Sequence, residues 1–474
     1  MRATALLRHF LVIDEVHASD AYMNRLLEVV LARHLQAGGH ALLMSATLGA
    51  AAREGFLRAA SGEKRPRIPP ALDEAVRLPY PALTHWHSGM ANPMQPIASP
   101  THSKRIHLHL EPWAEDPEAI AFKALDAARR GARVLMLRNT VKDCVATQQV
   151  LESIAERDHC EDLLFRCGAL PAPHHSRYTA SDRTALDHAL EEAFGKTAPA
   201  GRGVIAVATQ TVQQSLDLDA DVMLSDLCPM DVLLQRLGRL HRHSDRPRPD
   251  GFASPAPALV LVPTERDLTS LIRQSGQSRG EALGDHGFGT VYEDLRVLEA
   301  TWQELERRTL LTIPEDNREL VEAATHPEAL KRITDALGAP WQLHATKTVG
   351  ARLANQGIAV LNTANWGEEF GTQASLFPDR TQEPRISTRL GEEDRKMNFD
   401  PPFIGPFGSP VEVLALPAQF SKEASSDAKP TDLIPMPSGG AAFTFGPRRF
   451  VYDRLGLRPE SSAPHSPEDD NADA

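Results

Sequence analysis

Short apolar runs alternate with an amphipathic segment over the first fifty residues of the chain. Residues 10 to 13 (Phe-Leu-Val-Ile) predict a strand that ends in Asp14-Glu15. Apolar residues recur three and four positions apart from residue 20 to residue 36, which predicts an amphipathic helix. A second strand-like run, Ala41 to Met44, ends in Ser45-Ala46-Thr47. Open α/β sheets bind ligands at the carboxyl ends of their strands, so we expect chemistry at these two strand ends.

A second series of elements follows a proline-rich stretch, residues 65 to 100, which is typical of a connection. The pattern predicts a helix at 116–130, a strand at 133–137, a helix at 141–154 and a strand at 203–207. The two strands end in Arg138-Asn139-Thr140 and in Ala208-Thr209-Gln210. Because helices and strands alternate, the sequence predicts a parallel sheet and the α/β fold class.

The pattern changes beyond Arg242. Residues 246 to 257 resemble a linker, residues 259 to 262 predict a strand and residues 292 to 308 predict a helix. Pro and Gly then punctuate the chain to about residue 446. The last fifteen residues, 460 to 474, contain five acidic and no basic residues, so we expect a disordered tail there.

Composition excludes a membrane protein and a protein that coats nucleic acid. The 474 residues contain no apolar run of about 18 residues and no secretory signal, so we expect a cytoplasmic protein. The net charge of -12 is unevenly distributed. Residues 1 to 250 contain 29 basic and 30 acidic residues, whereas residues 251 to 474 contain 22 and 33. Nucleic-acid contacts are therefore expected from local grooves in the first half.

Asp14-Glu15 is the pair that a nucleotide hydrolase needs after a strand. One carboxylate holds Mg²⁺ through its water shell, and the next polarises the attacking water. Two acidic residues after a strand are more often a solvated turn, so this interpretation depends on other motifs.

Arginines provide that support. Residues 235 to 242 (Gln-Arg-Leu-Gly-Arg-Leu-His-Arg) place Arg239 and Arg242 three positions apart, and we expect them on one helical face. Two guanidinium groups there can reach a γ-phosphate across a domain cleft and stabilise its developing charge. A basic surface helix is the alternative interpretation.

In order along the chain, four segments resemble motifs II, III, V and VI of superfamily 2 helicases. These are Asp14-Glu15-Val16-His17, Ser45-Ala46-Thr47, the segment from Ala208 to Asp217, and the segment from Gln235 to Arg242. Further segments resemble the CRISPR-associated helicase-nuclease of type I interference systems, from residue 11 to about residue 457. They are Arg138-Asn139-Thr140-Val141, His175-Ser176-Arg177 with Asp182-Arg183, residues 226–231, residues 313–318 with 321–322, and residues 388–391.

The resemblance implies an ATP-dependent DNA helicase with ATP and Mg²⁺ as cofactors. Asp14 would coordinate Mg²⁺ through water, Glu15 would activate water, and Arg239 and Arg242 would sense the γ-phosphate. The implied ATP contacts are Asp217, Gln235 and Gly238, and the implied coupling residues are His17, Ser45 and Thr47. The implied contacts to single-stranded DNA are Asn139, Thr140, Thr209 and Gln210. The type I CRISPR surveillance complex is the implied partner.

The resemblance also implies two RecA-like parallel-sheet lobes, the first incomplete, and an accessory region. The expected domains are a partial first lobe (1–64), a connection (65–100), a second lobe (101–250), the accessory region (251–456) and an acidic tail (457–474). The first lobe alone is expected to be poorly stable, because its two strands lack sheet neighbours.

The chain departs from the family at the phosphate loop, Gly-x-x-x-x-Gly-Lys-Ser/Thr, which is absent. Gly195-Lys196-Thr197 does not replace it, since Leu190 stands where the first Gly belongs. The sequence also contains no His-Asp dipeptide of the family's nuclease domain. The leading hypothesis is the C-terminal part of the helicase-nuclease, inactive alone, with a separate N-terminal half as a further partner. A non-catalytic module that binds DNA or the surveillance complex is the alternative, and an RNA helicase is a weaker third interpretation.

Overall fold

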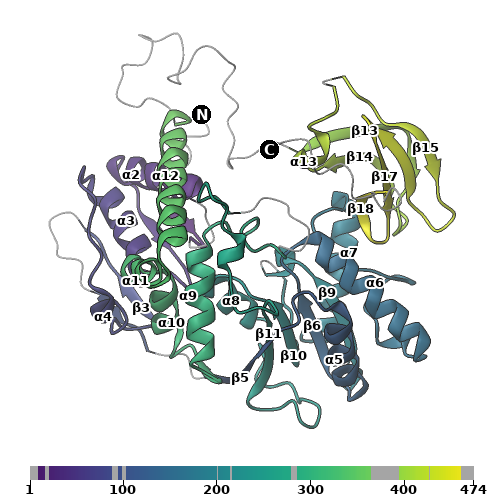
Figure 1. Ribbon diagram of the computed structural model, residues 1–474, viewed down its shortest axis with the longest axis horizontal. Helices are drawn as coiled ribbons and strands as arrows, with labels where there is room; N and C mark the ends of the chain where they lie inside the picture. Colours follow the sequence, from purple (N-terminus) through teal and green to yellow (C-terminus); the bar gives the residue numbers. More distant parts are fainter. Residues whose placement is uncertain are drawn as a thin grey trace. The chain divides into compact units, whose positions relative to one another are not determined.

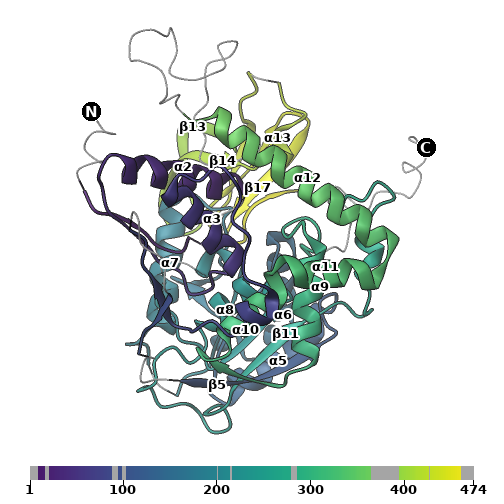
Figure 2. The same cartoon turned by 90° about the vertical axis from the view of Figure 1, so that its left-hand side faces the viewer.

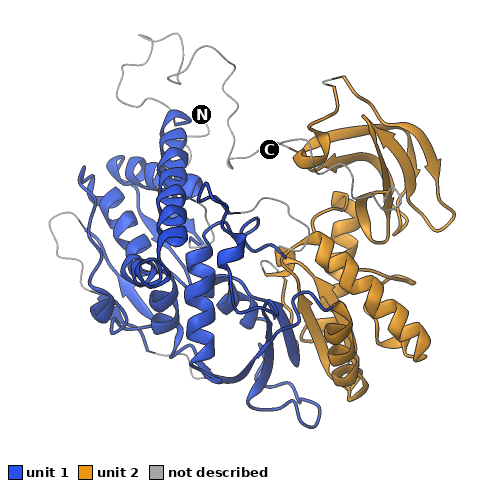
Figure 3. Ribbon diagram, in the orientation of Figure 1, with its two compact units in different colours: residues 1–116, 221–391 blue, residues 117–220, 392–474 orange. Residues whose placement is uncertain are grey.

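The computed structural model describes residues 9–16, 21–87, 94–98, 103–199, 201–213, 216–278, 286–363, 394–425 and 427–460. The chain divides into two compact units, each built from two stretches (Figure 3). Unit 1 comprises residues 1–116 and 221–391, and unit 2 comprises residues 117–220 and 392–474. Within the described ranges, no helix is long and apolar enough to cross a membrane. The domain boundaries derived from the sequence stay a prediction.

The N-terminal part of unit 1 is the strand–helix–strand unit that the sequence predicts. Strands β1 (Leu11–Ile13) and β2 (Ala41–Leu43) pair in parallel, and α2 (Ala21–Gln36) connects them. Helix α3 (Ala50–Ser61) follows β2, and Val16, Leu31 and Phe56 form a small core. None of the six strand residues is buried, and Val12 is 52% exposed.

Unit 1 also contains four strands in the order β12-β5-β11-β10. Strands β5 (Lys104–Glu111), β11 (Ala256–Leu261) and β10 (Val222–Asp226) run parallel, and β12 (Leu310–Ile313) is the antiparallel edge. All five residues of β10 are buried. Continuous apolar runs of this kind are typical of parallel strands that are covered on both faces. Strand β11 confirms the strand predicted at 259–262.

Helices complete unit 1 around these two sheets (Figure 1). In sequence order they are α8 (Met230–Leu237), α9 (Leu295–Glu306), α10 (Asn317–Thr325), α11 (Pro327–Leu337) and α12 (Ala339–Leu361). Helix α12 packs against α2, and α10 packs against α8 (Figure 2). The predicted connection at 65–100 contains α4 (Leu72–Ala75), β3 (Ala82–Thr84) and β4 (Met94–Pro96). The sequence predicted α9 but none of α10 to α12.

Unit 2 contains the second alternating series of elements. Strands β6 (Arg133–Leu137) and β9 (Val204–Ala208) pair in parallel, with α5 (Pro117–Arg129), α6 (Val141–Arg157) and α7 (Ala180–Phe194) around them. All five residues of β6 are buried. The predicted helices and strands of this series are confirmed to within three residues at their ends.

The C-terminal part of unit 2 is a β-structure that the sequence did not predict. Strands β13 (Arg395–Ile404) and β14 (Pro410–Leu416) form an antiparallel pair. The antiparallel sheet beside it consists of β15 (Thr431–Pro435), β16 (Ala441–Phe445), β17 (Arg448–Asp453) and β18 (Gly456–Pro459). Phe443 and Phe450 are buried and stack across β16 and β17, with ring centroids 6.0 Å apart.

Candidate functional site

Backbone hydrogen bonds join the two motif-bearing strand ends of unit 1. The Met44 N–H donates to the Ile13 carbonyl (2.9 Å), and the Val16 N–H donates to the Met44 carbonyl (3.2 Å). Asp14-Glu15 and Ser45-Ala46-Thr47 therefore leave the same edge of the sheet. The two strand ends at which the sequence predicted chemistry are therefore neighbours.

The acidic pair sits on a tight backbone turn. Glu15 has a φ of 53°, and its N–H donates to Asp14 Oδ1 at 2.9 Å. A positive φ is uncommon for a residue with a side chain and recurs at functional sites. Desolvation raises the pKa of Glu15, and the negative charge of Asp14 raises it further, whereas the positive charge of Arg239 lowers it. Arg239 thus lies close enough to Glu15 for their charges to interact.

Arg239 belongs to a turn after helix α8. The helix ends at Leu237, and Lys104 Nζ donates to the carbonyls of Leu237 (2.6 Å) and Leu240 (2.8 Å). A cation at these carbonyls closes the helix end favourably. Arg239 is only 9% exposed.

The expectation that Arg239 and Arg242 share one helical face is wrong. The helix has already ended, and His241 between them adopts a positive φ of 46°. This left-handed residue redirects the chain, so Arg239 is buried whereas Arg242 is exposed.

The remaining predicted nucleotide residues are divided between the units. Gln235 on α8 and Gly238 at its end are half-buried in unit 1. Asp217 belongs to unit 2, where it is exposed and its N–H donates to Glu191 Oε1 at 3.3 Å. His17 lies outside the described residues.

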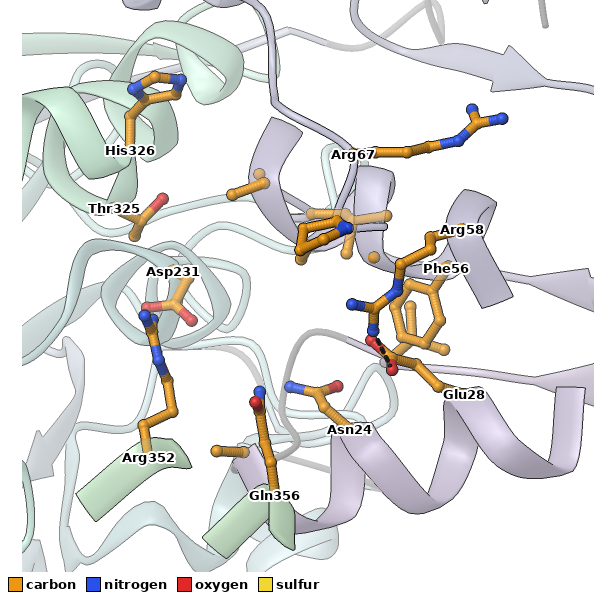
Figure 4. Close-up of a pocket in the computed structure, with 18 of the residues that line it drawn as sticks. Asn24, Glu28, Phe56, Arg58, Arg67, Asp231, Thr325, His326, Arg352 and Gln356 are labelled. Carbon is orange, nitrogen blue, oxygen red and sulfur yellow. Dashed lines mark hydrogen bonds and ion pairs between the residues drawn. The ribbon is translucent and has the colours of Figure 1, made fainter. Parts of the chain in front are cut away.

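The Ser-Ala-Thr motif borders a cavity of about 450 Å³ in unit 1. The Thr47 N–H donates to Ser45 Oγ at 3.1 Å, and Thr47 is 4% exposed. Thr47 Oγ1 has no hydrogen-bond partner among the described residues. Figure 4 shows side chains from α2, α3, α8, α10 and α12 around this cavity, among them Asn24, Glu28, Arg58, Asp231, Thr325, Arg352 and Gln356.

In unit 2, the predicted DNA-contacting residues follow two neighbouring strands. Asn139 and Thr140 come after β6, Thr209 and Gln210 come after β9, and the Arg138 N–H donates to the Ala208 carbonyl at 2.9 Å. The four residues therefore share one edge of the β6–β9 pair. Gln210 is exposed and Thr140 is half-buried, whereas Asn139 and Thr209 are 1% and 2% exposed.

Thr140 and His174 order the backbone at this edge. Thr140 caps helix α6, since its Oγ1 accepts the Asp143 N–H at 3.0 Å. The buried His174 lies with Nδ1 3.0 Å from Thr211 Oγ1 and with Nε2 2.7 Å from Asp187 Oδ1. Sequence reasoning predicted neither these contacts of His174 nor those of Lys104, because long-range pairing leaves no local pattern.

The chain resembles known CRISPR proteins in sequence. Residues 130–245 match the family model of the CRISPR-associated nuclease/helicase Cas3 C-terminal region. The Escherichia coli K12 CRISPR-associated endonuclease/helicase Cas3 is 31% identical over 317 residues, which are 65% of this chain and 31% of that protein. The Thermus thermophilus protein of the same name is 31% identical over 434 residues, which are 83% of this chain and 44% of that protein. The chain thus spans less than half the length of these relatives.

Solved structures agree in fold. The crystal structure of T. fusca Cas3-ATP aligns with a TM-score of 0.73 at 21% identity and covers 96% of this chain and 55% of that one. A chain of the CRISPR RNA-guided surveillance complex, pre-nicking, aligns with a TM-score of 0.61 at 21% identity, over 96% and 58% of the two chains. By family model, sequence and fold, this chain corresponds to the C-terminal portion of a Cas3 helicase-nuclease.

Proposed function

We propose that this chain supplies the water-activating and arginine-bearing part of an ATP-dependent DNA helicase in type I CRISPR antiviral interference. The observation that carries the proposal is the convergence of Asp14-Glu15 and Arg239 in unit 1, where the charge of Arg239 acts on Glu15. A carboxylate base beside a buried guanidinium is what phosphoryl transfer to water requires. The names of the similar structures, Cas3 with ATP, AMPPNP or ADP, support the same chemistry.

The acidic pair and Arg239 fit the metal and the γ-phosphate of a magnesium nucleotide, whereas the phosphate-loop motif that holds the phosphates from the other side is absent from the sequence. Bound Mg²⁺-ATP would supply the phosphoryl group and part of the charge neutralisation. Asp14 would hold the ion through water, and Glu15 would accept the proton of the attacking water. The raised pKa of Glu15 makes it a stronger base than an ordinary carboxylate. Arg239 would face the γ-phosphate, with Gln235, Gly238 and the exposed Arg242 as further nucleotide contacts of unit 1. Asp217 stays a predicted nucleotide contact of unit 2.

The shared edge after β6 and β9 would contact single-stranded DNA. Gln210 offers an amide group and Thr140 a hydroxyl group to the DNA. Asn139 and Thr209 are buried, so they would contact DNA through backbone groups and keep the strand ends in place. Groups of this kind bind phosphates without a strongly basic surface, in keeping with the near-neutral first half of the chain. The surveillance complex is the proposed partner, as the name of a similar structure suggests.

The β1–β2 sheet would receive the polypeptide that carries the phosphate loop. An apolar cavity of about 590 Å³ borders this sheet, and its walls include Leu31, Leu43 and Phe56. A parallel pair whose residues are all partly exposed is an incomplete sheet by the standards of α/β proteins. Because the sequence lacks the phosphate-loop motif, we expect no ATP turnover from this chain alone.

Reconstitution tests the proposal. The purified chain is mixed with a phosphate-loop polypeptide, from the same genome or cut from a Cas3 relative, and ATPase activity is measured with and without single-stranded DNA. We expect DNA-stimulated activity in the mixture and at least a hundredfold loss with Arg239→Ala, because removing one charge-stabilising group costs roughly that factor. Arg33→Ala on the exposed face of α2 is the matched control.

Two results would contradict this function. ATP turnover by the isolated chain would show that it holds phosphates without the missing loop. An inactive mixture that still binds single-stranded DNA would instead support the alternative, a non-catalytic module that binds DNA or the surveillance complex.

A further inference from the structure

Helix α10 holds the backbone that follows the Ser-Ala-Thr motif. Arg318 Nη1 donates to the Leu48 carbonyl (3.0 Å) and to Glu322 Oε1 (3.2 Å). The same Glu322 oxygen accepts the Ala50 N–H at 2.8 Å. Arg318 and Glu322 therefore hydrogen-bond to the two-residue link (48–49) between the motif and α3 and to the first residue of α3.

Glu322 also replaces a missing helix cap. The N-cap position of α3 is Gly49, which has no side chain to cap the helix. Glu322 comes from 272 positions further along the chain and is fully buried. A carboxylate at a helix N-terminus is stabilised by the exposed N–H groups and by the helix dipole. The first turn of α3 thus depends on a side chain from α10 for its cap.

Tyr80 adds a hydrogen bond between this part of the fold and the motif itself. Its hydroxyl donates to the Ala46 carbonyl at 2.6 Å and accepts from Asn317 Nδ2 at 3.3 Å. The Arg318 guanidinium lies 5.7 Å from the centroid of the Tyr80 ring. Ala46, Leu48 and Ala50 are therefore each bonded to α10, directly or through Tyr80.

The same helix contacts the element that leads to Arg239. Helix α10 packs against α8, and Arg239 lies in the turn after α8. Cavities of about 450 and 590 Å³ flank the motif, one lined by Thr47 and the other by Ser45. Open space beside a loop that is held at defined points permits a concerted shift of the loop.

We propose that Arg318 and Glu322 are positioning residues that couple the Ser45-Ala46-Thr47 loop to α8 through helix α10. The inference deepens the proposed ATP-driven function and rests on it. A shift of the loop would pull on Leu48 and Ala50, and α10 would pass that displacement to α8 and to the following helices. Neither side chain touches nucleotide in this scheme.

Hydrogen exchange of the purified 474-residue chain tests the hydrogen bonds of Arg318 and Glu322, and the test requires no ATPase activity. Glu322→Ala removes the acceptor of the Ala50 N–H, so we expect about tenfold faster exchange at residues 48–52, as losing a charged hydrogen bond implies. Glu322→Gln keeps an acceptor oxygen and should rescue most of this protection. Glu319→Gln is the matched control, because Glu319 lies on the same helix and pairs with Arg308.

The coupling is tested in the reconstituted complex by the number of DNA base pairs unwound per ATP hydrolysed. We expect that ratio to fall about tenfold with Arg318→Ala or Glu322→Ala, within the usual range of coupling between sites. Glu319→Gln should leave it within about twofold of the unsubstituted chain.

Each outcome decides a separate point. Unchanged exchange at residues 48–52 in Glu322→Ala would show that Glu322 does not hold the start of α3, and would overturn the proposal. Faster exchange with an unchanged ratio would make the contacts structural and overturn the coupling. An unsubstituted complex without ATPase activity would overturn the proposed function, and the coupling with it, whereas the exchange result would still stand.

Discussion

The buried His175 side chain bonds to two backbone groups, one of them 280 positions away in the sequence. It is fully buried in unit 2, with Nε2 3.0 Å from the Leu455 carbonyl and with Nδ1 accepting the Arg177 N–H at 3.2 Å. Both contacts require the neutral ring with its proton on Nε2. Burial lowers the pKa of His175 to about 3.

His175 should make unit 2 less stable in acid. Below about pH 6.5 the unfolded chain binds a proton at this ring, whereas the folded protein does not until about pH 3. The free energy of unfolding should therefore fall by up to about 1.4 kcal/mol per pH unit as the pH drops through this window.

Urea unfolding at a series of pH values measures this slope. We expect His175→Phe to lower this slope by the equivalent of about one bound proton. Part of the slope should remain, because the other histidines with shifted pKa values are still present. The exposed His188→Gln serves as the control. A slope in His175→Phe equal to that of the unsubstituted chain would show that the folded and unfolded states bind a proton at His175 equally, which would contradict the lowered pKa.

Elements with local patterns were predictable, whereas elements defined by distant contacts were not. Strands β6 and β9 and helices α2 and α6 were predicted, because apolar periodicity and polar strand ends are local features. The end of α8 at Leu237 was not predicted, because Lys104, which stabilises it, comes from the distant strand β5. The β-structure at 394–460 was missed because its short strands are interrupted by Gly and Pro.

Strand β17 holds helix α7 through one hydroxyl group. Tyr452 donates to Asp182, and its oxygen accepts the Thr179 N–H at 3.1 Å at the N-terminus of α7. Tyr452→Phe would leave the buried Asp182 carboxylate and the Thr179 N–H without this partner. We expect a loss of about 1–3 kcal/mol in the free energy of unfolding. Chemical denaturation measures it, with Phe450→Leu in the same strand as a packing control.

Stability should be uneven across the whole molecule. The residues of β1 and β2 are all partly exposed, whereas every residue of β6 and β10 is buried. Among the strands that the structure describes, β1 pairs with β2 alone, in agreement with the sequence-based expectation of strands without neighbours. Local opening requires less energy where little apolar surface is buried.

Hydrogen exchange of the intact chain resolves this difference. Amides at 11–13 and 41–43 should exchange on the order of a hundredfold faster than those at 133–137 and 222–226. Adding the phosphate-loop polypeptide should slow exchange at 11–13 and 41–43 selectively. Equal protection of all four strands in the isolated chain would contradict an incomplete sheet.

The discontinuous make-up of unit 1 also affects its synthesis. Glu322 caps α3 from 272 positions away, and Asn362 Nδ2 donates to the Tyr22 hydroxyl (2.9 Å) across 340 positions. At roughly 5–20 residues per second, a ribosome needs on the order of 15 to 70 seconds to add that much chain. Helices α2 and α3 can pack against each other early, whereas the side of α2 that faces α12 stays uncovered until translation delivers α12.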